Sequence, residues 1–153
     1  NNAAECPRTR STTVDGLEVQ FATNVLGRHW MISEFAHRLM AQRRPSPRIV
    51  MVSSNWAGDL DVDDLQFTSR PYDNDTAYRQ SKQAERMLTV CWSERLAGLL
   101  VNSCHPGDPC TTLSTALGYN LHASRDCSEA ARLPVSLAMD PAVTASGAWF
   151  PRM

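Results

Sequence analysis

Two short apolar segments, residues 48–52 and 99–104, constrain the fold of this chain more than any other feature of its sequence. The first reads Arg48-Ile49-Val50-Met51-Val52 and is rich in β-branched residues, and the second begins with Leu99-Leu100-Val101. The apolar residues run continuously and do not alternate with polar ones. This pattern is typical of strands that are buried on both faces, as in a parallel sheet.

Helical patterns surround both segments. Apolar residues recur at mostly helical spacing over residues 17–42, which predicts a long amphipathic helix opened by a capping box at Asp15 and Glu18 and ended near Pro45. Further helices are expected over 77–97 and 129–139, and a last strand over 147–150. This order predicts an α/β layer fold with a thin parallel sheet in one domain, residues 1–153.

Composition excludes several functions. The net charge of −1 and the absence of a basic stripe argue against nucleic-acid binding. No apolar run approaches the roughly 18 residues of a membrane span. Five cysteines without a CxxC motif favour reduced thiols in a reducing compartment, with the cytoplasm favoured. We expect no metal, because the spacing matches no compact zinc site in the set Cys104, His105, Cys110, His122 and Cys127.

Four residues carry the candidate chemistry. Tyr78 and Lys82 are four apart on the helix expected over 77–97 and share one face, while Ser54 follows the first strand, where ligands bind in open α/β sheets. Lys82 is the single lysine among fifteen basic residues. A nearby ammonium lowers the pKa of a tyrosine, which prepares the phenol for acid–base catalysis. Asn24 lies in mid-helix, where it either supports proton relay or serves structure by binding water or bending the helix.

The ordered set of Asn24, Val52-Ser53-Ser54 and Tyr78-x-x-x-Lys82 resembles the active-site tetrad of the short-chain dehydrogenase/reductase family. The resemblance implies that Tyr78 is the general acid/base, that Lys82 lowers its pKa and anchors the cofactor ribose, and that Ser54 positions the substrate oxygen. Asn24 would support the proton relay. An isolated Tyr-x-x-x-Lys pattern is more often a pair of surface residues, so the whole set carries the interpretation.

Other segments extend the resemblance along the chain. Asn1-Asn2-Ala3-Ala4 resembles the family's Asn-Asn-Ala-Gly segment, and His105-Pro106-Gly107 with Thr111 resembles its nicotinamide-side turn. The long interval from Ser54 to Tyr78 is similar to the retinol-dehydrogenase-like and WW-domain-oxidoreductase-like branch. The resemblance implies NADP or NAD as cofactor, with NADP favoured, bound by Asn2, Tyr78, Lys82, Pro106, Gly107 and Thr111.

The family's Gly-rich TGxxxGxG turn does not occur in this sequence. We therefore expect the C-terminal half of a doubly wound, Rossmann-type parallel sheet with flanking helices. One hypothesis is an oxidoreductase for small apolar aldehydes, ketones or alcohols, paired as a homodimer through the helices over 17–42 and 78–97. The alternative is a catalytically inactive, truncated relative that serves as a structural subunit. In that case a partner chain would cover the open sheet edge at Ile49-Val50-Met51.

Overall fold

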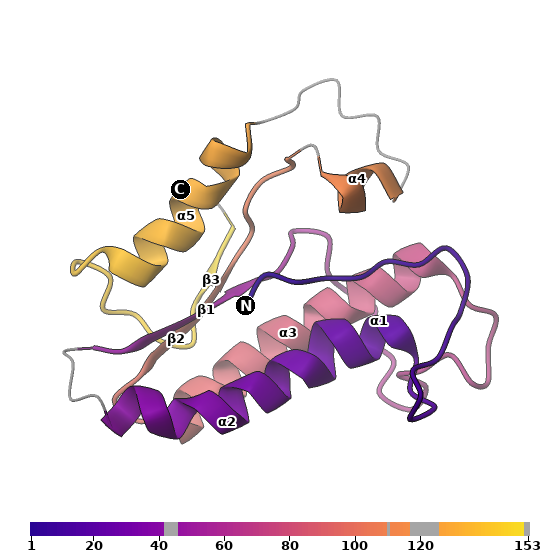
Figure 1. Cartoon of the computed structure of the whole chain (residues 1–153), viewed down its shortest axis with the longest axis horizontal. Coiled ribbons are helices and arrows are strands. Elements are labelled where there is room, and N and C mark those ends of the chain that lie inside the picture. Colours follow the sequence, from indigo (N-terminus) through magenta and orange to yellow (C-terminus); the bar gives the residue numbers. More distant parts are fainter. Residues whose placement is uncertain (42–45, 110, 117–125, 152–153) are drawn as a thin grey trace.

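The computed structural model describes residues 1–41, 46–109, 111–116 and 126–151, and its centre is a three-stranded parallel sheet (Figure 1). The strands are β1 (Arg48–Val52), β2 (Leu100–Cys104) and β3 (Trp149–Phe150), in the order β1-β2-β3. Arg48 pairs with Leu100 at one end of β1 and Val52 with Cys104 at the other. The predicted parallel sheet is confirmed.

The predicted N-terminal helix has three parts, α1 (Val19–Phe21), a π-helical turn η1 (Ala22–Leu26) and α2 (Gly27–Ala41). Its first cap is Glu18, whose carboxylate accepts hydrogen bonds from the backbone N–H groups of Gln20 and Phe21. The expected start at Asp15 is wrong, because a tight turn with Gly16 at φ +80° occupies that stretch. The expected end near Gln42 and Pro45 lies outside the described residues.

The second long helix, α3 (Asn74–Arg95), begins three residues earlier than the apolar pattern indicated. The Asp73 carboxylate caps it by accepting a hydrogen bond from the backbone N–H of Thr76. The helix expected over 129–139 is α5 (Cys127–Met139), which is capped in the same way by Asp126. A further short helix, α4 (Thr112–Ala116), was not predicted, because five residues are too few to show a helical period.

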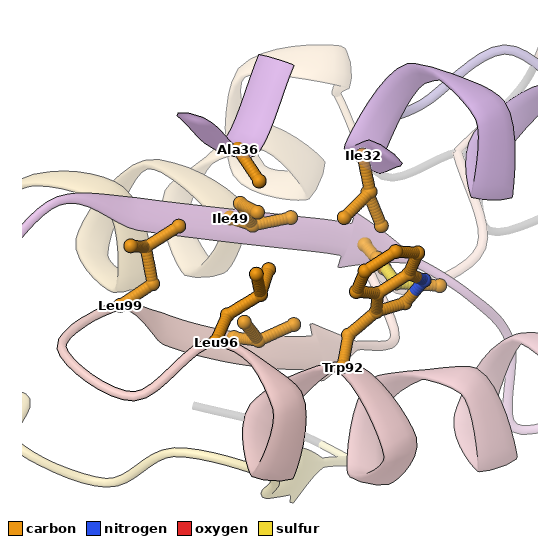
Figure 2. Packing of buried hydrophobic residues seen from close by; sticks show 8 residues of the cluster. Ile32, Ala36, Ile49, Trp92, Leu96 and Leu99 are labelled. Atoms are coloured by element: carbon orange, nitrogen blue, oxygen red, sulfur yellow. The ribbon is translucent and has the colours of Figure 1, made fainter. Parts of the chain in front are cut away.

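Helices cover both faces of the sheet (Figure 1). Side chains of α2 and α3 pack on one face, and Figure 2 shows Ala36 pointing toward Ile49 and Ile32 pointing toward Trp92. On the opposite face, α5 packs Leu133 and Leu137 against Cys104. Burial from both sides explains why the strand segments are continuously apolar, and the predicted Rossmann-type half-sheet with flanking helices is confirmed.

In this three-stranded sheet β1 is an edge strand. Asn1 lies along its outer side, donating from its amino group to the Val50 carbonyl at 2.9 Å and accepting from the Val52 N–H at 2.9 Å. The edge expected at Ile49-Val50-Met51 is therefore present and partly paired by the chain's own first residue. Within the described ranges, no helix has the length and apolar character needed to cross a membrane.

The core on the α2/α3 face yields a stability prediction for Met51. Its side chain is fully buried, and Met51→Ala should lower the free energy of unfolding by about 2–5 kcal/mol because it removes apolar contacts and leaves a cavity. Met87, 49% exposed on α3, is the matched control, and Met87→Ala should change stability by no more than about 0.5 kcal/mol. Urea unfolding followed by circular dichroism measures both, and equal losses would contradict this packing.

Candidate active site

A cleft of about 950 Å³ opens beside the carboxyl ends of β1 and β2. Ligands of open parallel α/β sheets bind at this end of the strands. The structure brings together in its lining every predicted site residue except Asn24, namely Asn2, Ser54, Tyr78, Lys82, Pro106, Gly107 and Thr111. Residues that are up to about a hundred positions apart in the sequence thus share one surface.

Ser54 is held in place by its backbone surroundings. It lies two residues beyond β1, is 8% exposed, and its Oγ accepts a hydrogen bond from the Trp56 N–H at 3.0 Å. Its carbonyl accepts a hydrogen bond from the Arg86 guanidinium, which stacks 3.7 Å from the centre of the Trp149 ring. Arg86 therefore links Ser54 to α3 and β3, and sequence reasoning had assigned it no role.

Tyr78 and Lys82 follow each other on one face of α3. The Lys82 Nζ lies 5.3 Å from the centre of the Tyr78 ring and is 2% exposed as a side chain. It donates to Glu85 Oε1 at 2.9 Å and more weakly to the Val52 carbonyl at 3.4 Å. The ammonium thus lies between the Tyr78 ring on α3 and the end of β1.

Burial shifts the pKa values of both groups. The pKa of Lys82 is lowered to about 8, because burial and the charge of Arg28 outweigh the attraction of Glu85. The pKa of Tyr78 is raised, chiefly by burial and then by the charge of Glu85, while a hydrogen bond with Ser54 lowers it. This is the reverse of the lowering expected from Lys82, so Tyr78 is a protonated phenol at neutral pH.

Asn24 is fully buried outside the cleft lining and connects two parts of the chain. Its amide oxygen accepts from the Glu5 N–H at 2.8 Å, and its Nδ2 donates to the Glu5 carbonyl and to Ser81 Oγ, both at 3.0 Å. It lies in the π-helical turn η1, a rare form that often marks functional positions. Its side chain is thus occupied by contacts with Glu5 and Ser81, and its role in proton relay stays a prediction.

Two charged residues beside Lys82 were missed by the sequence reasoning. Arg28 on α2 and Glu85 on α3 are 3% and 0% exposed and form an ion pair with 2.7 Å between Nη1 and Oε2. Charged residues in an amphipathic helix normally face solvent, so pattern reasoning assigns them there. The available signal was the spacing, since Glu85 lies three residues after Lys82 on the same helical face.

The donor set fits the nicotinamide and ribose part of a dinucleotide. An ammonium has three donors, and within the described part of the chain Lys82 uses two of them, on Glu85 and Val52. A donor remains for a ribose hydroxyl at the cleft surface. Gly107 has φ +90°, which favours glycine and lets the backbone approach a ring closely, and the exposed Asn2 amide lines the same cleft.

The candidate zinc ligands do not gather in the parts that the structure covers. Cys110 and His122 lie outside the described residues. Among the others, no group of three or more His, Cys, Asp or Glu side chains could hold a metal ion.

Several curated relatives match much of the chain, although no family model matches it. Retinol dehydrogenase 13 of Mus musculus is 40% identical over 126 residues, covering 78% of this chain and 36% of that protein. Dehydrogenase/reductase SDR family member 12 of Bos taurus is 33% identical over 159 residues, covering 98% of this chain and 50% of that protein. The chain thus spans between about a third and a half of the length of these relatives.

A solved structure has the same arrangement of elements. It is described as a putative uncharacterized protein from Mycobacterium paratuberculosis and superposes with a TM-score of 0.75 at 28% identity. The match covers 98% of this chain and 52% of that one. The likeness extends over essentially all of the elements that build the cleft.

The contacts of Asn24 predict a structural role for its side chain. Asn24→Ala would remove two hydrogen bonds to the Glu5 backbone, and at about 0.5–1.5 kcal/mol for each bond we expect a loss of about 1–3 kcal/mol in the free energy of unfolding. Faster hydrogen exchange of the Glu5 amide should accompany it. Ser81→Ala, which removes only the third contact of Asn24, should leave that exchange rate near its original value. Unchanged exchange in Asn24→Ala would refute the assignment.

Proposed function

This chain belongs to the short-chain dehydrogenase/reductase family, and from that membership we propose that it forms the catalytic part of a nicotinamide-dependent oxidoreductase. The reaction would interconvert a carbonyl compound and its alcohol. The observation that carries the proposal is the meeting of Ser54, Tyr78 and Lys82 in one cleft at the carboxyl ends of the strands.

Tyr78 would give the proton in the reductive direction. Its raised pKa keeps the phenol protonated at neutral pH, and the protonated form is the one that can donate to a carbonyl oxygen as negative charge develops there. Ser54, which lines the same cleft, would donate to the same substrate oxygen and fix its position. The two hydroxyl groups thus define where the carbonyl oxygen binds.

Lys82 would act from beneath the phenol. With a pKa of about 8 it is mostly an ammonium at neutral pH, so it can hold a ribose hydroxyl and stabilise negative charge on Tyr78 once the proton has left. A nicotinamide cofactor, when bound, supplies or accepts the hydride. Asn2, Pro106, Gly107 and Thr111 would contact it, and the family resemblance favours NADP over NAD.

The lining of the cleft supports an apolar substrate. Trp56 is 42% exposed and lines the cleft together with Leu113 and Val135, so an apolar aldehyde or ketone would find apolar contacts there. The mouse relative is named a retinol dehydrogenase, and we extend a retinoid-like or other apolar substrate to this chain as part of the proposal.

A homodimer through α2 and α3 stays a prediction. Its support is a set of apolar side chains that are about half exposed on these helices, namely Trp30, Met31, Phe35, Met87 and Val90. The alternative of a structural subunit stays a prediction as well, and it is supported by the edge position of β1. Nucleotide binding separates the two functions, because only the oxidoreductase requires it.

The proposal predicts the effect of removing one hydroxyl group. Tyr78→Phe should lower the rate of nicotinamide-dependent aldehyde reduction by about a hundredfold or more, because no general acid remains. Tyr72→Phe is the control, since Tyr72 donates to the Pro7 carbonyl away from the cleft, and its rate should stay within about threefold of the parent. A Tyr78→Phe rate within about threefold of the parent would refute the mechanism.

A further inference from the structure

Three charged side chains form a buried row beneath the cleft. Glu85 Oε1 lies 2.9 Å from Lys82 Nζ, and Glu85 Oε2 lies 2.7 Å from Arg28 Nη1. None of the three side chains is more than 3% exposed. The carboxylate therefore bridges two cations, with one oxygen on each.

Arg28 is itself fixed to the backbone of two other segments. Its Nη1 donates to the Val52 carbonyl at 2.9 Å and its Nη2 to the Ala3 carbonyl at 2.8 Å. The guanidinium is planar and rigid, so these two contacts fix the position of the positive charge that lies against Glu85 Oε2. The Glu85 carboxylate thus lies between a fixed guanidinium and the Lys82 ammonium.

We propose that Glu85 is a positioning residue for the reaction, whose carboxylate, anchored by Arg28, holds the Lys82 ammonium in place and in its charged form beneath Tyr78. This inference deepens the proposed function and rests on it. Glu85 does not line the cleft, so it acts through Lys82 rather than on the substrate.

The charges around Lys82 explain why a carboxylate is needed. Arg28 faces it from α2 and opposes its charge, whereas Glu85 on α3 favours it. Cys6 from the N-terminal segment adds no charge at neutral pH, because burial raises the pKa of its thiol to about 11. Tyr78 lies above the ammonium, and the Asn1 amino group, whose pKa is lowered by burial and by Arg28, interacts with Arg28 and Glu85. Without the Glu85 charge, burial and Arg28 would both disfavour the ammonium.

The sign of the effect follows from these contributions. The pKa of Lys82 is already lowered from 10.5 to about 8 with Glu85 present. Neutralising Glu85 removes the largest contribution that raises it, so the ammonium would be lost at a lower pH. A neutral Lys82 would neither hold a ribose hydroxyl with a charged donor nor favour the phenolate. Reductase activity should then fall at a lower pH.

The single lysine of this chain makes the test direct. The full-length protein, grown with lysine carrying ¹³C at Cε, gives a resonance for Lys82 that is assigned by its disappearance in Lys82→Arg. In Glu85→Gln the titration midpoint of this resonance should fall by at least about one pH unit. The pH at which reductase activity is lost on the alkaline side of the pH–rate profile should fall by a similar amount. The KM for the nicotinamide nucleotide should rise.

Glu94→Gln is the matched control, because Glu94 lies on the same helix but is exposed, and its midpoint should equal that of the parent. Arg28→Gln combined with Glu85→Gln removes both charges and should return the midpoint toward the parent value. A folded Glu85→Gln protein with an unchanged midpoint and an unchanged alkaline limb would overturn the proposal.

Glu85→Asp keeps the inference testable where the Gln variant does not fold. Aspartate keeps the negative charge, but its side chain is one methylene shorter, so the carboxylate lies farther from Lys82. We therefore expect a smaller fall of the Lys82 midpoint and a raised KM for the nucleotide. Parent values for both quantities would overturn the proposal. The resonance titrates whether or not the protein is an active reductase. Absence of activity in the parent would therefore refute the proposed function. The Lys82 titration midpoints of the parent and the Glu85 variants would still show whether Glu85 holds the charge on Lys82.

Discussion

The Arg28 guanidinium holds together the parts of the chain from which the cleft is built. It extends from α2 to the Ala3 carbonyl, to the Val52 carbonyl at the end of β1 and to the Glu85 carboxylate on α3. These groups belong to segments that are far apart in the sequence. Because Arg28 is 3% exposed, each unmade contact would leave a polar group buried without a partner, which costs about 1–3 kcal/mol or more. The geometry of the site therefore depends on this contact.

Pattern reasoning located the strands and long helices because both carry strong apolar signals. Residues 48–52 and 100–104 are strands since helices bury them from both sides, and α3 extends the expected helix only by the turn that Asp73 caps. The π-helical turn η1 could not be predicted from the sequence. Such a turn adds one residue to the helix, and the shift that this makes in the apolar pattern is smaller than the irregularity already present in that pattern. Asn24 in this turn bonds to the backbone of Glu5, a tertiary contact that local spacing does not encode either.

The site divides along the same line. Ser54, Tyr78 and Lys82 were predictable because their spacing is fixed by local structure, the end of a strand and one face of a helix. Glu85 and Arg28 were not, because their burial results from the approach of α2 to α3, which no local spacing encodes. The direction of the Tyr78 pKa shift was missed for the same reason. The spacing of Tyr78 and Lys82 indicated a neighbouring ammonium. It indicated neither the burial of the phenol nor the nearby Glu85 carboxylate, which together raise the pKa of Tyr78.

Stability alone does not explain the row of Arg28, Glu85 and Lys82. Taking three charges out of water costs several kcal/mol per ion, and well-packed apolar residues in such places are often as stable or more so. The row is nevertheless buried directly beneath Tyr78, where we propose that it holds the ammonium in one position. Burial lowers the pKa of Lys82 to about 8, and the Glu85 carboxylate opposes a further fall. A charge with one position and a pKa close to neutrality suits a proton-transfer site. The cost of burial is thus better explained by the demands of the chemistry than by those of the fold.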